Sequence, residues 1–466
     1  MTTDRPPSVN INDITNRKAG EYLAVGRFED AFNLMEKSHI SEYENYLGEK
    51  LTPQVKNLEQ FQTELDDISR RSGSDTTVVY PLILSDRLEL LIIPPKGKGR
   101  PFREFVAAAK ESEIIPIIQE FANNIRDPSS QDYLEQSQKL YDWLIRPYSD
   151  RLQKMQNNTQ SSEAQFNSKQ NIKPSSSENI SPSKVETTEN RAKAKLPPTL
   201  VFVMDGGLRV VPVAALHDGK QFLIEKYALA NLPYLRVTRL EDRDRRLNSI
   251  LAMGLTESVQ GLSALPSVKI EVNTISSKVI AGDSYLDKEF TIANLQEKRR
   301  QGNFTILHLA THAQFVSNSS KGSFIQFWNE RLSLDRIPSL RFDSPVIEML
   351  TLSACETAVG QNLGLGGLSI SSGARSVLAS LWQVSDAGTA PLMIQFYNSF
   401  PENITKAIAL QRAQIDLLKG KVTIQNGKVV GIPKLPDIPL PLAVNSNINL
   451  QHPYFWSSFI LIGNWL

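Results

Sequence analysis

A histidine and the single cysteine of this chain each follow a buried-strand pattern. His312 ends the apolar stretch 304–312, and Cys355 ends the apolar stretch 345–355. Runs of this kind are typical of strands that are covered on both faces of a parallel sheet. Because chemistry in open α/β sheets gathers beyond the carboxyl ends of the strands, we expect both side chains at one edge. A thiol attacks an acyl carbon as the thiolate, so the His312 imidazole is the base that Cys355 needs.

The competing interpretation of a lone cysteine is a small, buried, apolar residue, which is the commoner role. Cys355 falls at a strand end, within 353–357, where exposure is expected, and it is matched by a second strand that ends in a histidine. These two observations favour the dyad. His308 lies inside its strand and is predicted to be a hydrogen-bonded core residue. The backbone N–H groups of Ala313 and Cys355 are candidates for stabilising a tetrahedral oxyanion.

Three charged residues near other strand ends are candidate lining residues of a substrate pocket. Asp386 follows the third buried-strand pattern, 375–382, and could receive a basic side chain. Its alternative role is the N-cap of a helix that begins at Ala387, and the sequence favours neither role. Asp205 and Arg209 flank a further strand end. They either line the cleft or form a surface ion pair, and the ion pair is favoured.

The composition of the chain narrows the class of protein. Its 466 residues indicate two or three folding units, and 41% hydrophobic residues are enough for real cores. The net charge of +1 argues against a broad nucleic-acid or anionic-membrane surface. No apolar run is long enough to span a bilayer, and the N-terminus lacks the apolar core of a secretory signal. One cysteine excludes an internal disulfide, so a cytoplasmic setting is expected.

The motifs of common cofactor and metal sites are absent or weak. The segment 364–367 (GLGG) lacks the full dinucleotide-binding spacing, and there is neither a phosphate loop nor a His-Glu-x-x-His motif. With one cysteine and scattered histidines, a structural zinc site is not expected either. The sequence therefore predicts a protein that needs no metal and no organic cofactor.

The domain organisation is read from changes in pattern and composition along the chain. The expected segments are a helical, tetratricopeptide-like segment at 1–72, the first part of a non-catalytic α/β lobe at 75–152, a disordered low-complexity insertion at 153–197, the remainder of that lobe at 198–247 and the main α/β lobe at 248–466. The insertion has too few apolar residues to offset the entropy of ordering it. No second copy of the helical unit recurs at the period of about 34 residues that defines tetratricopeptide arrays, so a helical pair that packs on the next domain is the favoured interpretation.

Several further elements follow from periodicity and turn residues. They are a hairpin over 76–84 and 87–93, helices near 102–125 and 131–152, an amphipathic helix over 271–280, a hairpin turn at Asn426-Gly427 and a last strand over 459–462.

Four blocks of sequence, in this order and spacing, resemble those of a known family. They are 308–312 (HLATH), 352–357 (LSACET), 373–382 (GARSVLASLW) and 452–456 (HPYFW). Together they resemble the CHAT family, caspase-like domains of peptidase clan CD that are related to separase and often joined to tetratricopeptide repeats. The resemblance covers about 198–466. Residues 75–152 are similar to the leading, non-catalytic α/β lobe of cyanobacterial-type members.

The resemblance implies a caspase-like α/β/α sandwich with a mostly parallel sheet, and a cysteine endopeptidase activity. It assigns the general base to His312, the nucleophile to Cys355 and an acidic pocket residue to Asp386. The chain departs from the family at Ala313, where a glycine usually follows the catalytic histidine; a methyl group there could crowd the oxyanion hole or forbid a positive φ.

Two functions from different classes follow from these observations. The first is a peptidase that cleaves a protein partner or its own 153–197 segment. The second is a catalytically inactive scaffold that kept the fold, with Ala313 marking a relaxed site and the N-terminal helices recruiting a regulatory protein.

Overall fold

The computed structural model of the chain describes residues 11–47, 50, 56–156, 196–238, 240, 249–314, 322–353, 364–400, 404–441 and 447–466. Cys355 and residues 157–195 of the predicted insertion lie outside these ranges.

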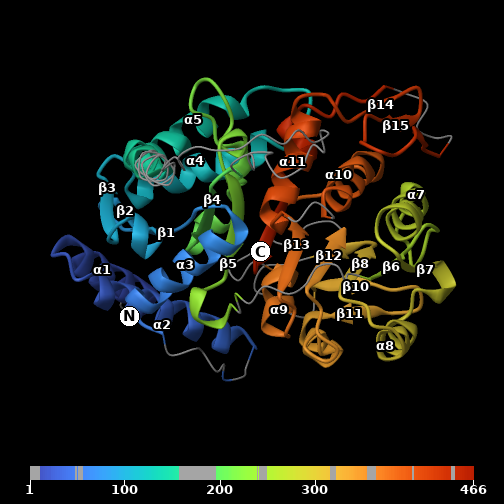
Figure 1. The fold of residues 1–466 in the computed structure, drawn as a ribbon, viewed down its shortest axis with the longest axis horizontal. Helices are drawn as coiled ribbons and strands as arrows, with labels where there is room; N and C mark the ends of the chain where they lie inside the picture. The colour runs from blue at the N-terminus through green and yellow to red at the C-terminus, as the bar shows by residue number, and fades with distance from the viewer. Residues whose placement is uncertain are drawn as a thin grey trace, which may run out of the picture.

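One sheet of eleven strands runs through the molecule, in the order β3-β2-β1-β4-β5-β17-β13-β12-β8-β6-β7 (Figure 1). The strands are β1 (Thr76–Ile83), β2 (Leu88–Ile93), β3 (Phe102–Val106), β4 (Thr199–Val203), β5 (Ala228–Leu232), β6 (Ile250–Gly254), β7 (Gly282–Leu286), β8 (Ile306–Ala310), β12 (Met349–Ser353), β13 (Ser376–Ser380) and β17 (Phe459–Gly463). Every residue of β8, β12 and β13 is buried, as expected for apolar strands covered on both faces. The predicted α/β class with a mostly parallel sheet is confirmed.

Nine strands of the sheet form two parallel blocks that run in opposite directions, and β2 and β3 extend the first block through antiparallel pairs. In the first, β1, β4, β5 and β17 are parallel to one another. In the second, β13, β12, β8, β6 and β7 are parallel. The blocks meet where β17 pairs with β13 antiparallel, over Phe459–Gly463 and Ser376–Ser380. The carboxyl ends of the two blocks therefore lie at opposite edges of the sheet.

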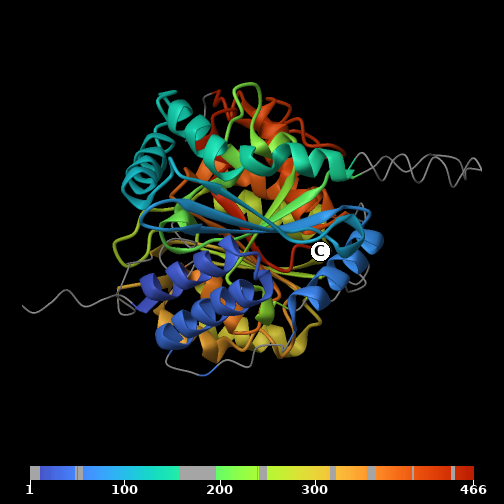
Figure 2. The same cartoon turned by 90° about the vertical axis from the view of Figure 1, so that its left-hand side faces the viewer.

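Helices cover both faces of the sheet (Figures 1 and 2). One layer holds α4 (Glu111–Asn124), α5 (Tyr133–Leu144), α7 (Ser267–Thr274), α10 (Asp386–Asn398) and α11 (Lys406–Leu418). The other holds α1 (Ile11–Ala24), α2 (Phe28–Leu47), α3 (Leu58–Ser72), α8 (Ile292–Gln301) and α9 (Gly364–Ser371). The buried residues of both layers and of the sheet form one continuous hydrophobic core.

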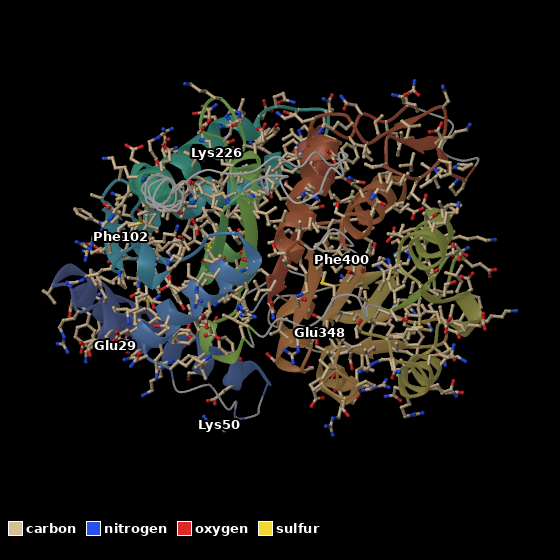
Figure 3. The ribbon with its side chains drawn as sticks, viewed as in Figure 1. Glu29, Lys50, Phe102, Lys226, Glu348 and Phe400 are labelled. Atoms are coloured by element: carbon tan, nitrogen blue, oxygen red, sulfur yellow. The ribbon has the colours of Figure 1, made fainter. Side chains whose placement is uncertain are left out.

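The N-terminal helices α1 and α2 are part of this core. Their apolar face, which includes Leu23, Phe32 and Met35, is buried. The carboxylate of Glu36, fully buried, accepts hydrogen bonds from the Tyr80 hydroxyl and from the N–H groups of Leu235 and Arg236. Glu29, labelled in Figure 3, lies in the first turn of α2. Its side chain accepts from the Leu58 N–H at the start of α3.

Smaller sheets occupy two of the connections. Strands β9 (Ala313–Gln314), β10 (Phe324–Gln326) and β11 (Arg331–Ser333) form the first, and β14 (Thr423–Gln425), β15 (Lys428–Val430) and β16 (Ile438–Pro439) form the second. The predicted turn between β14 and β15 is confirmed: Asn426 and Gly427 both have positive φ, at 49° and 70°. This is the backbone that a two-residue hairpin turn requires.

The predicted hairpin of β1 and β2 and the last strand, β17, are confirmed, whereas the prediction that a helix begins near residue 102 was wrong. Residues 102–106 form the edge strand β3, paired with β2, and the helix α4 begins only at Glu111. Pairing with an available strand decides the structure of so short a stretch. The helix expected over 271–280 begins earlier, as α7 at Ser267, and passes into a π-helical turn over Ile275–Val279.

Candidate active site

Strands β8 and β12, which carry the blocks 308–312 and 352–357, are parallel neighbours in register. Ala310, the last residue of β8, is the partner of Ser353, the last residue of β12. The Thr311 N–H continues this ladder by donating to the Ser353 carbonyl at 3.2 Å. His312 follows Ala310 by two residues, and Cys355 follows Ser353 by two in the sequence. Cys355 itself lies outside the described residues.

The His312 ring is half-buried at this edge and is held by a backbone carbonyl. Its Nε2 atom lies 2.7 Å from the carbonyl oxygen of Ser263, in the loop before α7. A carbonyl only accepts, so Nε2 carries the hydrogen. In the neutral ring the lone pair is then on Nδ1, which is the atom that can accept a proton.

Ala313 lies in β9, in extended backbone that any L-residue adopts. It opposes Ile325 of β10, and the Gln326 N–H donates to the His312 carbonyl at 2.9 Å. This bond makes Ala313 and Ile325 a non-hydrogen-bonded pair, so the Ala313 N–H points away from β10. The φ angle of Ala313 is not positive, so its methyl group imposes no backbone strain.

Asp386 is the first residue of α10 and faces the start of α7. Its Oδ2 atom accepts from the Ser267 N–H at 2.7 Å. The N-cap of α10 is Ser385, whose hydroxyl accepts from the Gly388 N–H at 3.2 Å. The alternative of Asp386 as N-cap was therefore wrong.

Burial is the main influence on the Asp386 carboxyl and raises its pKa. The Glu271 carboxylate also raises this pKa, whereas the Ser267 N–H and the charge on His312 lower it. The balance is a raised pKa. Glu271 and His312 are therefore both close enough to Asp386 to influence its carboxyl group electrostatically.

The structure does not bring Asp205 and Arg209 together with His312. They follow β4, whose carboxyl end lies at the opposite edge of the sheet, and four strands separate β4 from β8. Asp205 accepts from Asn16 of α1 at 2.8 Å. Arg209, which is buried, donates through both terminal nitrogens to the Glu42 carboxylate of α2 at 3.0 Å. The two residues therefore bind the N-terminal helices to the first block of the sheet.

Sequence reasoning missed a buried polar network directly behind the edge that carries His312. Glu271 of α7 is 1% exposed, and its Oε1 atom accepts from the Ser353 hydroxyl at 2.7 Å. The same oxygen lies 2.9 Å from His308 Nε2. The other His308 nitrogen lies 3.4 Å from the Tyr397 hydroxyl, which lies 2.5 Å from Thr351 Oγ1. The prediction that His308 is a hydrogen-bonded core residue is confirmed.

One signal in the sequence could have found Glu271. It falls between Val268 and Val272, on the apolar stripe that continues to Ile275, and all four residues are buried. A carboxyl group on the core face of a helix needs hydrogen-bond donors, because burying it without them is strongly unfavourable. Each hydrogen bond to a charged group of this kind contributes about 1.5–3 kcal/mol.

Neither a metal cluster nor a membrane-crossing helix is found among the described residues. Within those ranges, no three or more His, Cys, Asp or Glu side chains are grouped so as to hold a metal ion. The helices in the same ranges are too short or too polar to span a bilayer.

The mostly parallel sheet, its two helical layers and the strand ends that meet beside His312 define a caspase-like α/β/α sandwich. The family model of the CHAT domain matches residues 134–464, well over half of the sequence. The chain therefore belongs to the CHAT domain family. The match begins earlier than the expected 198 and includes α5 and the 153–197 segment.

Solved structures with a similar fold have low sequence identity to this chain. Two crystal structures of the Saccharomyces cerevisiae separase–securin complex match it, each with a TM-score of 0.46. Their identities are 10% and 11%; each match covers 86% of this chain but only 31% and 30% of those chains. The Arg-specific cysteine proteinase gingipain R matches with a TM-score of 0.37 and 9% identity, over 59% of this chain and 65% of that chain. No curated protein matches the sequence.

Proposed function

We propose that this chain is a caspase-like cysteine endopeptidase with His312 as general base and Cys355 as nucleophile. The observation that carries the proposal is the in-register pairing of Ala310 with Ser353. Because β8 and β12 are parallel, the residues that follow them leave the sheet at the same edge. His312 and Cys355 each stand two residues beyond this pair in the sequence.

The contacts of His312 suit the role of a base. The Ser263 carbonyl holds the Nε2 hydrogen, which leaves the lone pair on Nδ1 for the thiol proton. In the proposed reaction the thiolate attacks the peptide carbonyl carbon and the imidazolium returns its proton to the leaving amine. Water, deprotonated by the same ring, then releases the acyl group from sulfur. The scheme requires no metal and no organic cofactor.

The backbone N–H groups of Ala313 and Cys355 are proposed to bind the oxyanion of the tetrahedral intermediate. The outward direction of the Ala313 N–H and the relaxed backbone of β9 support this role for Ala313. Removing one such donor from an enzyme typically costs about 3–4 kcal/mol of transition-state stabilisation.

Asp386 is proposed to bind a basic side chain of the substrate. Its Oδ2 atom is oriented by the Ser267 N–H, so the second carboxylate oxygen can accept from a lysine or an arginine. The substrate is proposed to be a protein partner or the chain's own 153–197 segment.

The alternative function, an inactive scaffold that recruits a partner through its N-terminal helices, has less support. The apolar face of α1 and α2 is already buried in the core of the chain. The extended backbone at Ala313 also removes the argument that its methyl group strains the site.

A covalent peptide probe tests the proposed function. A thiol-directed peptide with a basic residue before its electrophile is expected to label the wild type and to spare Cys355→Ala. Because the chain has one cysteine, His312→Ala keeps the only thiol and is expected to be labelled much more slowly. His217→Ala, a substitution in the connection between β4 and β5, is the matched control. Equal rates for wild type and His312→Ala would remove the assignment.

A further inference from the structure

One short segment contacts all three of the elements that carry the candidate site residues. Ser263, Ser267 and Glu271 follow one another at a spacing of four residues along α7 and its preceding loop. The Ser263 carbonyl binds His312, beyond β8, and the Ser267 N–H binds Asp386, beyond β13. Glu271 binds Ser353, the last residue of β12.

Glu271 differs from the other two because it contacts the sheet itself. Its Oε1 atom contacts Ser353 on β12 and His308 on β8, so a single carboxylate oxygen spans the two strands. Both side chains are buried, at 7% and 0% exposure. An ionised carboxylate only accepts, which places the hydrogen of His308 on Nε2 and directs the hydroxyl hydrogen of Ser353 at Glu271.

A second contact fixes the same strands from the neighbouring helix. The Tyr397 hydroxyl of α10 lies between His308 of β8 and Thr351 of β12. The two strands are therefore joined by buried side chains close to their carboxyl ends as well as by their backbone ladder. Buried networks with satisfied partners of this kind rigidify the part of the core that they occupy.

We propose that Glu271 is a positioning residue for the His312–Cys355 pair: it holds the ends of β8 and β12 at the spacing and register that the pair requires. This inference rests on the proposed function, and it adds a residue whose contacts among the described residues are with Ser353 and His308. Glu271 acts on the thiol indirectly, through Ser353 at the end of β12 and through His308 in β8, the strand that leads to His312.

The single cysteine gives a test that needs no substrate. The rate of alkylation by iodoacetamide, measured against pH, reports only Cys355. A thiol with no basic partner reacts with a pH midpoint near ~8.5, and pairing with a histidine lowers it. Glu271→Gln is expected to raise the midpoint by at least about half a unit, which lowers the rate at neutral pH about threefold. In the His312→Ala background the same substitution is expected to have no effect.

The matched control is Glu36→Gln, the same change at an equally buried carboxylate among the N-terminal helices. It should lower the melting temperature and leave the alkylation midpoint unchanged. If Glu271→Gln is poorly soluble, Ser353→Ala and Ser353→Thr replace it. The alanine variant should raise the midpoint, and the threonine variant, which keeps the hydroxyl, should restore it.

The outcomes separate the two proposals. If His312→Ala leaves the midpoint where it is in the wild type, the dyad is wrong and the positioning role fails with it. If His312→Ala raises the midpoint and Glu271→Gln does not, only the positioning role fails. It also fails if Glu271→Gln shifts the midpoint equally in both backgrounds, or if Glu36→Gln shifts it as much.

Discussion

At the scale of single residues, the candidate site contains a carboxyl group, that of Asp386, whose charged form is disfavoured by burial. Asp386 lies between the first turns of α10 and α7, where backbone N–H groups favour a carboxylate. Burial nevertheless raises the pKa of this carboxyl. A carboxylate kept in such a place, at a cost to the fold, is typical of a residue retained for function.

Substitution of Asp386 by asparagine should therefore stabilise the folded chain at neutral pH. A raised pKa means that the folded protein binds more protons than the unfolded chain between the ordinary and the raised value, so stability falls as pH rises through that window. The neutral amide of the asparagine variant carries no such penalty. The melting temperature of Asp386→Asn should exceed that of the wild type at pH 7, and the difference should close toward pH ~4.

The same variant should lose cleavage of substrates with a basic residue before the scissile bond, mainly through a higher KM. Calorimetry at several pH values, together with steady-state kinetics, checks both expectations. A lower melting temperature at pH 7 would contradict the account of Asp386 as a destabilised carboxylate.

Residue types alone predicted some of these roles and missed others. His308 was recognised as a core residue because it lies inside an apolar strand. Glu271 was placed at the start of a helix, where a carboxylate is ordinarily exposed, because the start of α7 at Ser267 has no strong sequence signal. The N-cap, one of the two roles considered for Asp386, belongs to Ser385 one residue earlier, since both residues are good capping types.

At the scale of elements, close packing sets the distance between β6, β8 and α7. Gly254 ends β6, and a Cβ atom there would lie 2.5 Å from the Ala310 carbonyl oxygen and 2.6 Å from Val268 Cγ1. Only glycine permits this approach. The absence of a side chain at Gly254 thus allows β8, which leads to His312, to lie close to α7, which hydrogen-bonds to Asp386.

Gly254→Ala should destabilise the chain by about 1–3 kcal/mol, the usual range for an overpacked core. It should also slow labelling by the peptide probe, because Ala310 lies two residues before His312. Gly282→Ala is the matched control, since its methyl group would meet the Ile250 carbonyl oxygen at the other end of β6. That variant should lose at least as much stability in urea titrations and keep its normalised labelling rate. Equal loss of labelling in both variants would contradict a local effect.

The short helix α12 (Pro453–Trp456) connects the two blocks of the sheet near the end of β13. His452, its N-cap, accepts from the Tyr454 N–H through Nδ1 at 3.1 Å, and its Nε2 lies 2.8 Å from the Ser130 carbonyl. The Trp382 indole N–H donates to the Tyr454 carbonyl at 3.1 Å. Protonation of His452 would put a hydrogen on Nδ1 as well as on Nε2. Nδ1 could then no longer accept the hydrogen bond from the Tyr454 N–H.

Acid should therefore weaken this connection. Burial is the main influence and lowers the pKa of His452, while the Ser130 carbonyl and the Asp127 carboxylate act to raise it. A lowered folded pKa gives stability that is present above about 6.5 and is lost as pH falls through the folded value. As the pH falls below about 6.5, the melting temperature should fall more steeply for the wild type than for His452→Asn. Parallel curves for the two proteins would contradict this.

At the scale of the whole molecule, the direction of β17 decides which strand ends share an edge. The sequence predicted β17 as a strand, but nothing in 459–462 reports whether it runs with or against β13. The direction of a strand in the sheet depends on the connection that leads to it. The chain reaches β17 through α11, the β14–β16 sheet and α12. The consequence is that Asp205 and Arg209 lie at the edge opposite to His312, which no local pattern could have predicted.

The division of the chain at residue 247 into two lobes remains a prediction. One continuous sheet contains strands from both lobes, so we expect them to unfold together. Strand β17 pairs with β13 on one side and with β5 on the other. Beside this junction, the buried Gln411 of α11 donates to the Ile224 carbonyl at 2.7 Å. Gln411→Ala leaves that buried carbonyl without its donor, which should cost about 1–3 kcal/mol.

If the two blocks unfold together, the loss of stability caused by Gln411→Ala should appear in both blocks. Hydrogen exchange measured by mass spectrometry should then show protection falling by the same factor in peptides from β1–β2 and from β12–β13, although Gln411 touches neither. Gln414→Ala, on the same helix, removes donors to Trp456 and Phe459 and serves as the comparison. A loss of protection confined to one block in the Gln411 variant would mean that each block unfolds independently. The first block would then be a folding unit separate from the second block, which carries the candidate site.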